Sequence, residues 1–361
     1  MKKLITMCAV LGVLLMTAGP AMADSISPTS FSGSLLVGES VTIRKTVIVS
    51  EGTVKEGTGD VFFLSDTTGS MGGTIDSVQT NASAILSGLS IYGNIQTGAG
   101  NYQDFPTNSW GGISDHAYEL DSTINGATAT QTAINSWDAP LGWGDDWPES
   151  NLYALSQAAG ASTDWRSDSE KFILWFGDAP GHELSNTSGY PGPSTAVTIS
   201  TLKAAGVTVF AFNVGAIGGD MIGGLDGVGQ ATAITDATGG DLYNGFGTDI
   251  VKTIVDAIGA GFASYSEVSI LAPSLPGLGI TITPVSYMGA FERDVTREFE
   301  FDVTFKGLAP GIYDFDMYAA VDGGKVATEA DYIEVVVPVP GALLLGMLGL
   351  SVAGIKLRKR T

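Results

Sequence analysis

Cysteine and histidine are scarce in this chain of 361 residues: the one cysteine is Cys8, and the two histidines are His116 and His182. Cys8 lies within the first 23 residues, so the rest of the chain has no pair of thiols that could form a disulfide. The zinc-protease pattern HExxH is excluded, because His182-Glu183 is not followed by a histidine at the required spacing. No GxSxG elbow, Walker loop or strand-linked GxGxxG is found in its required context. These absences predict a protein that is not an enzyme.

Positive charge is also scarce. The chain has 17 Lys and Arg against 38 Asp and Glu, which gives a net charge of −21 at pH 7. All the acidic residues lie between Asp24 and Glu334, whereas six of the basic residues lie near the two ends. A body this acidic repels phosphate backbones, so we expect no binding to nucleic acid. The composition suits a solvated extracellular protein or one that attracts cations.

The two ends have the patterns of export and anchoring signals. Residues 1–23 have a basic start, an apolar middle and the small-residue site Ala21-Met22-Ala23, which predicts a signal peptide cleaved before Asp24. Residues 337–361 contain a proline-rich head, an apolar run through Ile355 and a basic end. Together with the valines before it, this run is long enough to span a bilayer, with the basic end on the cytoplasmic side. The sequence therefore predicts an exported protein with a C-terminal membrane anchor.

The last 25 residues also resemble the PEP-CTERM sorting signal of Gram-negative bacteria, in which a Pro-Glu-Pro-like head precedes a transmembrane run and a basic end. Val339 stands here between Pro338 and Pro340, where that signal usually has Glu. The resemblance implies processing by an exosortase. It also implies attachment at, or release from, the surface of bacteria that often make an exopolysaccharide matrix.

The body of the chain divides by pattern into an α/β part and a β part. Over residues 58–265, buried apolar runs alternate with segments that have helical spacing, which predicts a doubly wound, mostly parallel sheet. Strands are expected at four segments: 61–65, 95–102, 171–177 and 207–214. Helices are expected at five segments: 74–89, 128–137, a segment that begins at Pro148, 194–205 and 248–262.

Residues 266–336 consist of alternating or β-branched runs between Gly and Pro turns, which predicts an antiparallel β-sandwich. The N-terminal segment 24–57 has the same alternating, β-branched pattern, most clearly over 34–49, and no predicted helix goes with it. We therefore expect 24–57 to join the sandwich, so that the α/β part is inserted within it. The alternative is that 34–49 forms a loose edge strand or a linker.

Polar residues follow two of the buried strands at the point where each strand ends. Asp66, Thr68 and Ser70 come after the run Val61–Leu64, and Asp178 follows the strand over 171–177. Open α/β sheets bind ligands at the carboxyl ends of their strands. Carboxylate and hydroxyl oxygens suit Mg²⁺, which takes about six oxygen ligands and keeps some waters. The alternatives are ordinary turn residues for the first three and a capping acid for Asp178.

The Asp-x-Thr-Gly-Ser sequence after a buried strand resembles the von Willebrand factor A domain, whose metal-ion-dependent adhesion site carries Asp-x-Ser-x-Ser there. Asp66, Thr68 and Ser70 match that motif position by position, and Asp178 stands where the family has its last acid. The resemblance implies that these four residues bind a divalent cation, Mg²⁺ first. Mn²⁺ or Ca²⁺ would also suit oxygen ligands.

The segment 142–155, GWGDDWPESNLYAL, further resembles the integrin β version of that domain. The resemblance implies that Glu149 joins the adhesion site, while Asp146 and Asp104 belong to a neighbouring ion site. Gly144 replaces a ligating Asn of that neighbouring site, and Gly72-Gly73-Thr74 lacks the acids of a third site. The alternatives are a first-turn helix acid for Glu149 and surface acids for the other two.

Three functions are compatible with these patterns. We expect foremost a secreted or surface-anchored binding protein, in which the bound cation captures an acidic group of a protein or matrix partner. The second is a structural component of the envelope or exopolysaccharide matrix, whose metal only stabilises the fold. The third is a hydrolase or metal-assisted phosphatase using Asp66 and Asp178. It ranks last because the sequence offers no base, nucleophile or basic phosphate clamp.

Overall fold

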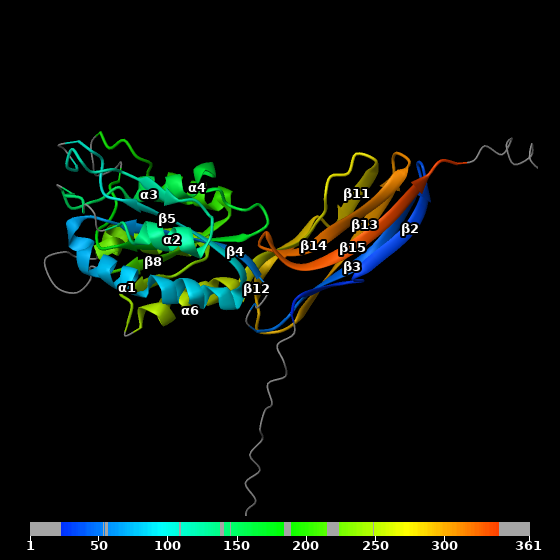
Figure 1. Ribbon diagram of the computed structural model, residues 1–361, viewed down its shortest axis with the longest axis horizontal. Helices are drawn as coiled ribbons and strands as arrows, with labels where there is room; N and C mark the ends of the chain where they lie inside the picture. Colours follow the sequence, from blue (N-terminus) through cyan, green and yellow to red (C-terminus); the bar gives the residue numbers. More distant parts are fainter. Residues whose placement is uncertain are drawn as a thin grey trace, which may run out of the picture.

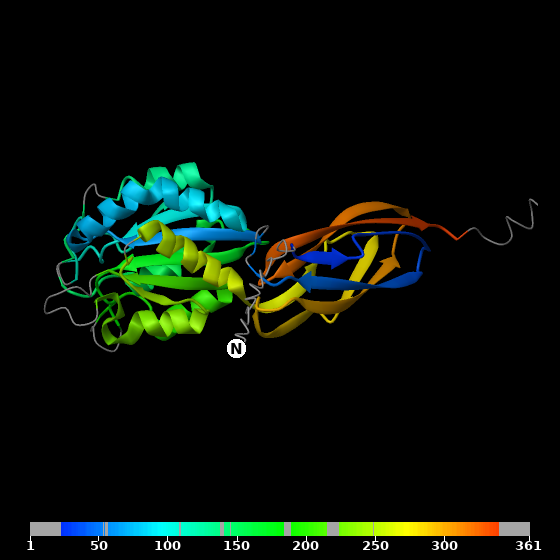
Figure 2. The same ribbon diagram turned by 90° about the horizontal axis from the view of Figure 1, so that it is seen from below.

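The computed structural model describes residues 23–52, 54, 57–107, 110–137, 141–144, 146–183, 189–214, 224–247 and 249–338. They form two parts that lie end to end, an α/β part and a β-sandwich (Figures 1 and 2). Residues 1–22 of the predicted signal peptide and the apolar run of the predicted anchor from residue 339 onward lie outside the described residues. Within the described residues, no helix is both long enough and apolar enough to cross a membrane.

The α/β part is built on a six-stranded sheet with the strand order β6-β5-β4-β7-β8-β9. All neighbours in it are parallel except β5 and β6, which are antiparallel. The strands are β4 (Gly57–Asp66), β5 (Gly93–Tyr102), β6 (Glu119–Ser122), β7 (Glu170–Gly177), β8 (Val207–Asn213) and β9 (Leu242–Asn244). The first strand of this part, β4, therefore lies inside the sheet, between β5 and β7.

Helices cover both faces of this sheet (Figure 1). Val61 and Phe63 of β4 pack with one set of helices: α1 (Gly72–Leu89), α2 (Ala127–Ile134) and α6 (Ile250–Ala263). Phe62 and Leu64 pack with the other set: α3 (Asn151–Ala158), α4 (Thr195–Ala205) and α5 (Gln230–Thr238). Short 3₁₀ helices are η1 (Gly69–Met71), η2 (Ser90–Tyr92), η3 (Ala161–Thr163) and η4 (Gly224–Gly229). Because β4 is buried on both faces, its central residues 61–64 form a continuous apolar run without alternation.

The β-sandwich consists of a four-stranded sheet, β1-β3-β13-β11, and a five-stranded sheet, β12-β10-β14-β15-β2. The first contains β1 (Ser25–Ser27), β3 (Ser40–Val49), β11 (Leu278–Thr283) and β13 (Arg297–Gly307). The second contains β2 (Ser30–Leu36), β10 (Ser264–Leu271), β12 (Ser286–Glu292), β14 (Gly311–Val321) and β15 (Gly324–Val336). Both sheets thus combine strands from before and after the α/β part, and β3 pairs with β13 over ten residues.

The predicted combination of a mostly parallel α/β sheet and a β-sandwich is confirmed, but several details differ. The strands β6 and β9 and the helix α5 were not predicted. The sandwich is not wholly antiparallel, because β2 pairs with β15 in parallel. The helix expected from Pro148 begins at Asn151 instead. The backbone N–H of Glu149 donates to the Pro180 carbonyl, and the Ser150 hydroxyl donates to the Gln103 and Ala117 carbonyls. These contacts hold the backbone at Glu149 and Ser150 outside the helix, although proline favours a helix start at that point.

Arg293 joins the sandwich to the end of α6. Its Nε donates to the Phe262 carbonyl (3.0 Å), and its Nη1 donates to the Ser50 carbonyl (3.3 Å). Nη1 and Nη2 also bind the two oxygens of Asp24, at 2.8 and 2.9 Å. The side chains of Arg293 and Asp24 are only 3% and 7% exposed. This ion pair is therefore buried at the junction of the two parts.

Candidate metal site

Asp66 is the last residue of β4 and is wholly buried. Its Oδ1 accepts hydrogen bonds from the Thr68 backbone N–H (2.8 Å) and the Thr68 hydroxyl (2.7 Å). The Thr68 and Ser70 hydroxyl oxygens lie 3.3 Å apart. Because Oδ1 fixes the turn after β4, the two hydroxyls gather beside the same carboxylate.

Two further carboxylates reach this end of the sheet from other elements. Asp178 directly follows β7, which pairs with β4, and its negative charge contributes to the raised pKa of Asp66. Glu149 reaches the site through backbone pairing, since its N–H donates to the Pro180 carbonyl and its own carbonyl accepts from the His182 N–H. The structure thus brings together the residues that the sequence predicts for the adhesion site: Asp66, Thr68, Ser70, Glu149 and Asp178.

Each of the three carboxylates has one buried oxygen without a hydrogen-bond partner in the described part of the chain: Asp66 Oδ2, Glu149 Oε2 and Asp178 Oδ1. Burial, followed by the negative charge of Asp178, raises the pKa of Asp66 to about 8. Burial, followed by the charge of Asp66, raises the pKa of Glu149 to about 12. Burial also raises the pKa of Asp178. Without a cation, the protein must either protonate these groups or hold unpaired negative charge in its interior.

The donor atoms at this position fit a hard cation. Carboxylate and hydroxyl oxygens are ligands that Mg²⁺ accepts. Among the described residues, Asp66, Glu149 and Asp178 do not form a group whose ligand atoms all lie within 4.8 Å of one another. An ion here would therefore take the hydroxyls of Thr68 and Ser70 together with part of the carboxylate set, and water would complete its coordination, as Mg²⁺ prefers.

The raised pKa values predict how the metal-free protein responds to pH. Between about pH 4 and pH 8, the folded chain keeps a proton on Asp66 that the unfolded chain has lost. We therefore expect the unfolding temperature in the presence of a chelator to fall as pH rises through this window. Thermal unfolding followed by circular dichroism at several pH values measures it. An unfolding temperature that rises steadily over the same window would contradict the prediction.

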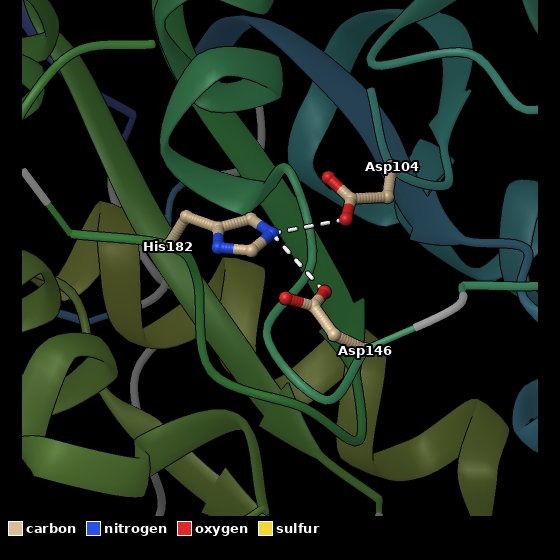
Figure 3. Close-up of side chains that lie close together, drawn as sticks. All are labelled: Asp104, Asp146 and His182. Atoms are coloured by element: carbon tan, nitrogen blue, oxygen red, sulfur yellow. Dashed lines mark hydrogen bonds and ion pairs between the residues drawn. The ribbon is translucent and has the colours of Figure 1, made fainter. Parts of the chain in front are cut away.

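A second cluster lies beside the first and consists of Asp104, Asp146 and His182 (Figure 3). His182 Nε2 is 2.9 Å from Asp104 Oδ2 and 3.4 Å from Asp146 Oδ1. Burial raises the pKa of Asp104 against the opposing effect of His182, and it raises the pKa of Asp146 to about 6. The sequence predicts Asp104 and Asp146 near one ion, and the structure places them together. It adds His182, a nitrogen donor that stands four residues after Asp178.

Asp115 is a positioning residue that the sequence analysis does not identify. Its buried carboxylate accepts backbone hydrogen bonds from Gly112 (2.8 Å), Trp143 (3.0 Å) and Gly144 (3.0 Å). Gly144 has a φ of +52°, and a Cβ built on it would lie 2.5 Å from Glu149 Oε1. The loop backbone at Gly144 therefore packs directly against the Glu149 carboxylate. A side chain at position 144 would displace that carboxylate, which explains why glycine stands where the resemblance expects Asn.

Comparison with known proteins adds little to this geometry. No family model matches the sequence, and no curated protein matches it. Two crystal structures of the pilus adhesin SpaC from Lactobacillus rhamnosus GG, one of them in an open conformation, are similar with TM-scores of 0.40 and 0.39 and 14% sequence identity. The matches cover 82% and 80% of this chain but only 45% and 46% of the adhesin chains. A similarity this low assigns no function, so the residues of the site must supply it.

Proposed function

We propose that the chain is a secreted or surface-anchored binding protein with a von Willebrand factor A type domain of the integrin β variety. A divalent cation, Mg²⁺ first, would be held by Asp66, Thr68, Ser70, Glu149 and Asp178. The observation that carries this proposal is the set of three buried carboxylates, each with one unpaired oxygen, at the ends of neighbouring strands. A divalent cation would offset their charge, binding part of this carboxylate set directly and the rest through coordinated water.

Binding rather than catalysis follows from what surrounds these carboxylates. Mg²⁺ keeps several waters, so a carboxylate from a partner can replace one of them. The net charge of −21 disfavours the binding of a phosphate substrate. The partner in this proposal is therefore a protein or matrix component that presents an acidic group. Asp104 and Asp146, with His182, would hold a neighbouring ion.

The proposed location rests on the two ends of the sequence. The signal peptide over 1–23 would export the chain, and the tail over 337–361 would hold it in the membrane until an exosortase processes it. The α/β part over 58–265 and the sandwich formed by 24–57 and 266–336 would then lie outside the cell. Such a placement makes a matrix or cell-surface partner accessible to the site.

Calorimetric titration of the chain with Mg²⁺ tests the metal site. We expect saturable binding in the unaltered protein and loss of the binding step at Asp66 in the Asp178→Asn variant, because this change removes a buried carboxylate whose charge acts on Asp66. Any binding that remains in this variant would belong to the neighbouring cluster of Asp104, Asp146 and His182. The Asp236→Asn variant is the matched control, since Asp236 is an exposed acid on α5. Absence of Mg²⁺, Mn²⁺ and Ca²⁺ binding by the unaltered protein would contradict the proposal.

A second measurement separates a binding site from a metal that only stabilises the fold. With Mn²⁺ as the paramagnetic probe, an open coordination position gives exchangeable water and fast relaxation of the water protons. We expect added acetate to displace such water and reduce the relaxation enhancement. If the ion is closed off by protein ligands, the enhancement is small and acetate does not change it, which would favour the structural role.

A further inference from the structure

Lys45 has an unusual position for a lysine, because it lies on β3 in the core of the sandwich and is 0% exposed. Its Nζ contacts Glu329 Oε1 and lies 3.3 and 3.1 Å from Asp331 Oδ1 and Oδ2. Both carboxylates lie on β15 and are also buried. The ring of Phe305 is 5.7 Å from Nζ. Since β3 and β15 belong to different sheets, this contact connects the two layers of the sandwich.

This cluster is poorly explained as an ordinary ion pair. Two carboxylates surround a single ammonium group, and Glu329 Oε2 has no hydrogen-bond partner in the described part of the chain. Burying charged groups is costly, and apolar side chains of similar size often give equal or greater stability. A reaction between these groups would remove two of the three charges from the core.

We propose that Lys45 and Asp331 condense to form an intramolecular amide bond, with Glu329 transferring the protons. Asp331 is assigned as the electrophile because its Oδ1 also accepts a hydrogen bond from the Phe31 backbone N–H at 3.0 Å. That donor is placed to stabilise the negative charge that develops on this oxygen during attack. Glu329 is assigned as the proton carrier because it contacts Nζ and lies two residues before Asp331, on the same face of β15.

The proposed reaction balances without any added reagent. Glu329 takes a proton from the Lys45 ammonium group, and the neutral amine attacks Cγ of Asp331. The C–N bond forms while Oδ1 carries the negative charge toward the Phe31 N–H. Glu329 delivers protons from the nitrogen to Oδ2, the C–Oδ2 bond breaks, and Oδ2 leaves as water. One ammonium and one carboxylate thus become one amide and one water, with no change in oxidation state.

Two features of the site favour this reaction over simple pairing. Burial raises the pKa of Glu329 to about 7 against the opposing effect of Lys45, so this side chain can both accept and donate a proton near neutral pH. The fold also holds the amine against the carboxyl group, which replaces an encounter in solution by a fixed approach. Lys252 and Asp256 also form an ion pair, but their side chains are 70% and 57% exposed. We expect no condensation at that pair, and it serves as an internal control.

Mass spectrometry of the folded, then denatured chain tests the proposal directly. We expect the intact mass to be lower than the mass calculated from the sequence by one water molecule. Trypsin should not cleave after Lys45, and the peptide 45–55 should be recovered joined to the peptide that begins at Val326. An intact mass equal to the calculated one, with ordinary cleavage after Lys45, would overturn the proposal even if no variant folds.

Two isosteric variants identify the roles of the carboxylates. Asp331→Asn should form the same amide with loss of ammonia instead of water, so its product should have the same mass as the linked unaltered chain. Glu329→Gln should fold but form the bond much more slowly, because the proton carrier is lost. Formation at an unchanged rate in Glu329→Gln would remove Glu329 from the mechanism. A bond from Lys45 to residue 329 instead of 331 would overturn the assignment of the electrophile.

Discussion

The Asp66→Asn variant is expected to lose Mg²⁺ binding at the end of β4 and yet, in the presence of a chelator, to be more stable than the unaltered protein. Asp66 is wholly buried, one of its oxygens has no hydrogen-bond partner in the described part of the chain, and its pKa is about 8. Ionising it near pH 8 without a cation therefore costs free energy, which the neutral amide avoids. The Asn oxygen can still accept the two hydrogen bonds from Thr68. We expect the metal-free variant to gain on the order of 2 kcal/mol in its free energy of unfolding.

Thermal unfolding with chelator and with excess Mg²⁺ measures both effects in one experiment. For the unaltered protein we expect a large increase of the unfolding temperature on addition of Mg²⁺, and for Asp66→Asn a much smaller one. The stability difference between the metal-free variant and the metal-free unaltered protein should become smaller toward pH 5, where Asp66 is protonated in the folded protein. Asp236→Asn again serves as the control for loss of an exposed acid. A metal-free Asp66→Asn protein that is less stable than the unaltered one near pH 8 would show that the buried Asp66 carboxylate does not destabilise the metal-free fold.

The Arg293→Met variant is expected to lower the free energy of unfolding by about 3–5 kcal/mol, the usual cost of removing one partner of a buried ion pair. The variant leaves the Asp24 carboxylate buried and without its cation, and it also removes the donor to the Phe262 carbonyl. Denaturation by urea measures the change. The double variant Asp24→Asn/Arg293→Met should have a higher free energy of unfolding than Arg293→Met alone, because the unpaired charge of Asp24 is then absent.

Arg44→Met is the matched control for this experiment. Arg44 pairs with Glu300 and Asp302 on the surface, and its side chain is 60% exposed. Exposed ion pairs contribute little, so we expect a change below about 1 kcal/mol. An Arg293→Met variant that loses no more stability than Arg44→Met would show that the junction does not depend on the buried pair.

The fold was predictable where one pattern determines one structure. The run from Val61 to Leu64 indicates a strand buried on both faces, and all four side chains are 0% exposed. The alternating pattern of the sandwich strands tells which side chains face the core, but it does not tell which strand pairs with which. The parallel pairing of β2 with β15 therefore could not be derived from the sequence. The start of α3 was predicted wrongly because tertiary hydrogen bonds at Glu149 and Ser150 prevail over the local preference of Pro148.

The site was predictable where it lies next to a strand end. Asp66 ends β4, Thr68 and Ser70 come just after it, and Asp178 directly follows β7, so the sheet itself brings them to one end. His182 and Asp115 carry no such signal, since each reaches the site through a loop whose path depends on distant contacts. Whether these residues bind Mg²⁺ stays a prediction. The Lys45 cluster is still harder to predict from the sequence, because Glu329 and Asp331 lie 284 and 286 positions after Lys45.

The placement of the two parts determines how the molecule would carry mechanical load. β4 runs away from the sandwich toward Asp66, while β15 ends at the far end of the sandwich (Figure 1). A pull between a partner held at Asp66 and an anchored C-terminus would draw β3 and β15 lengthwise in opposite directions. The hydrogen bonds between β3 and β13 would then be strained in shear, all together, instead of opening one after another. An amide between Lys45 and Asp331 would pass tension directly from β3 to β15, beside the second path that enters the sandwich from α6 through β10.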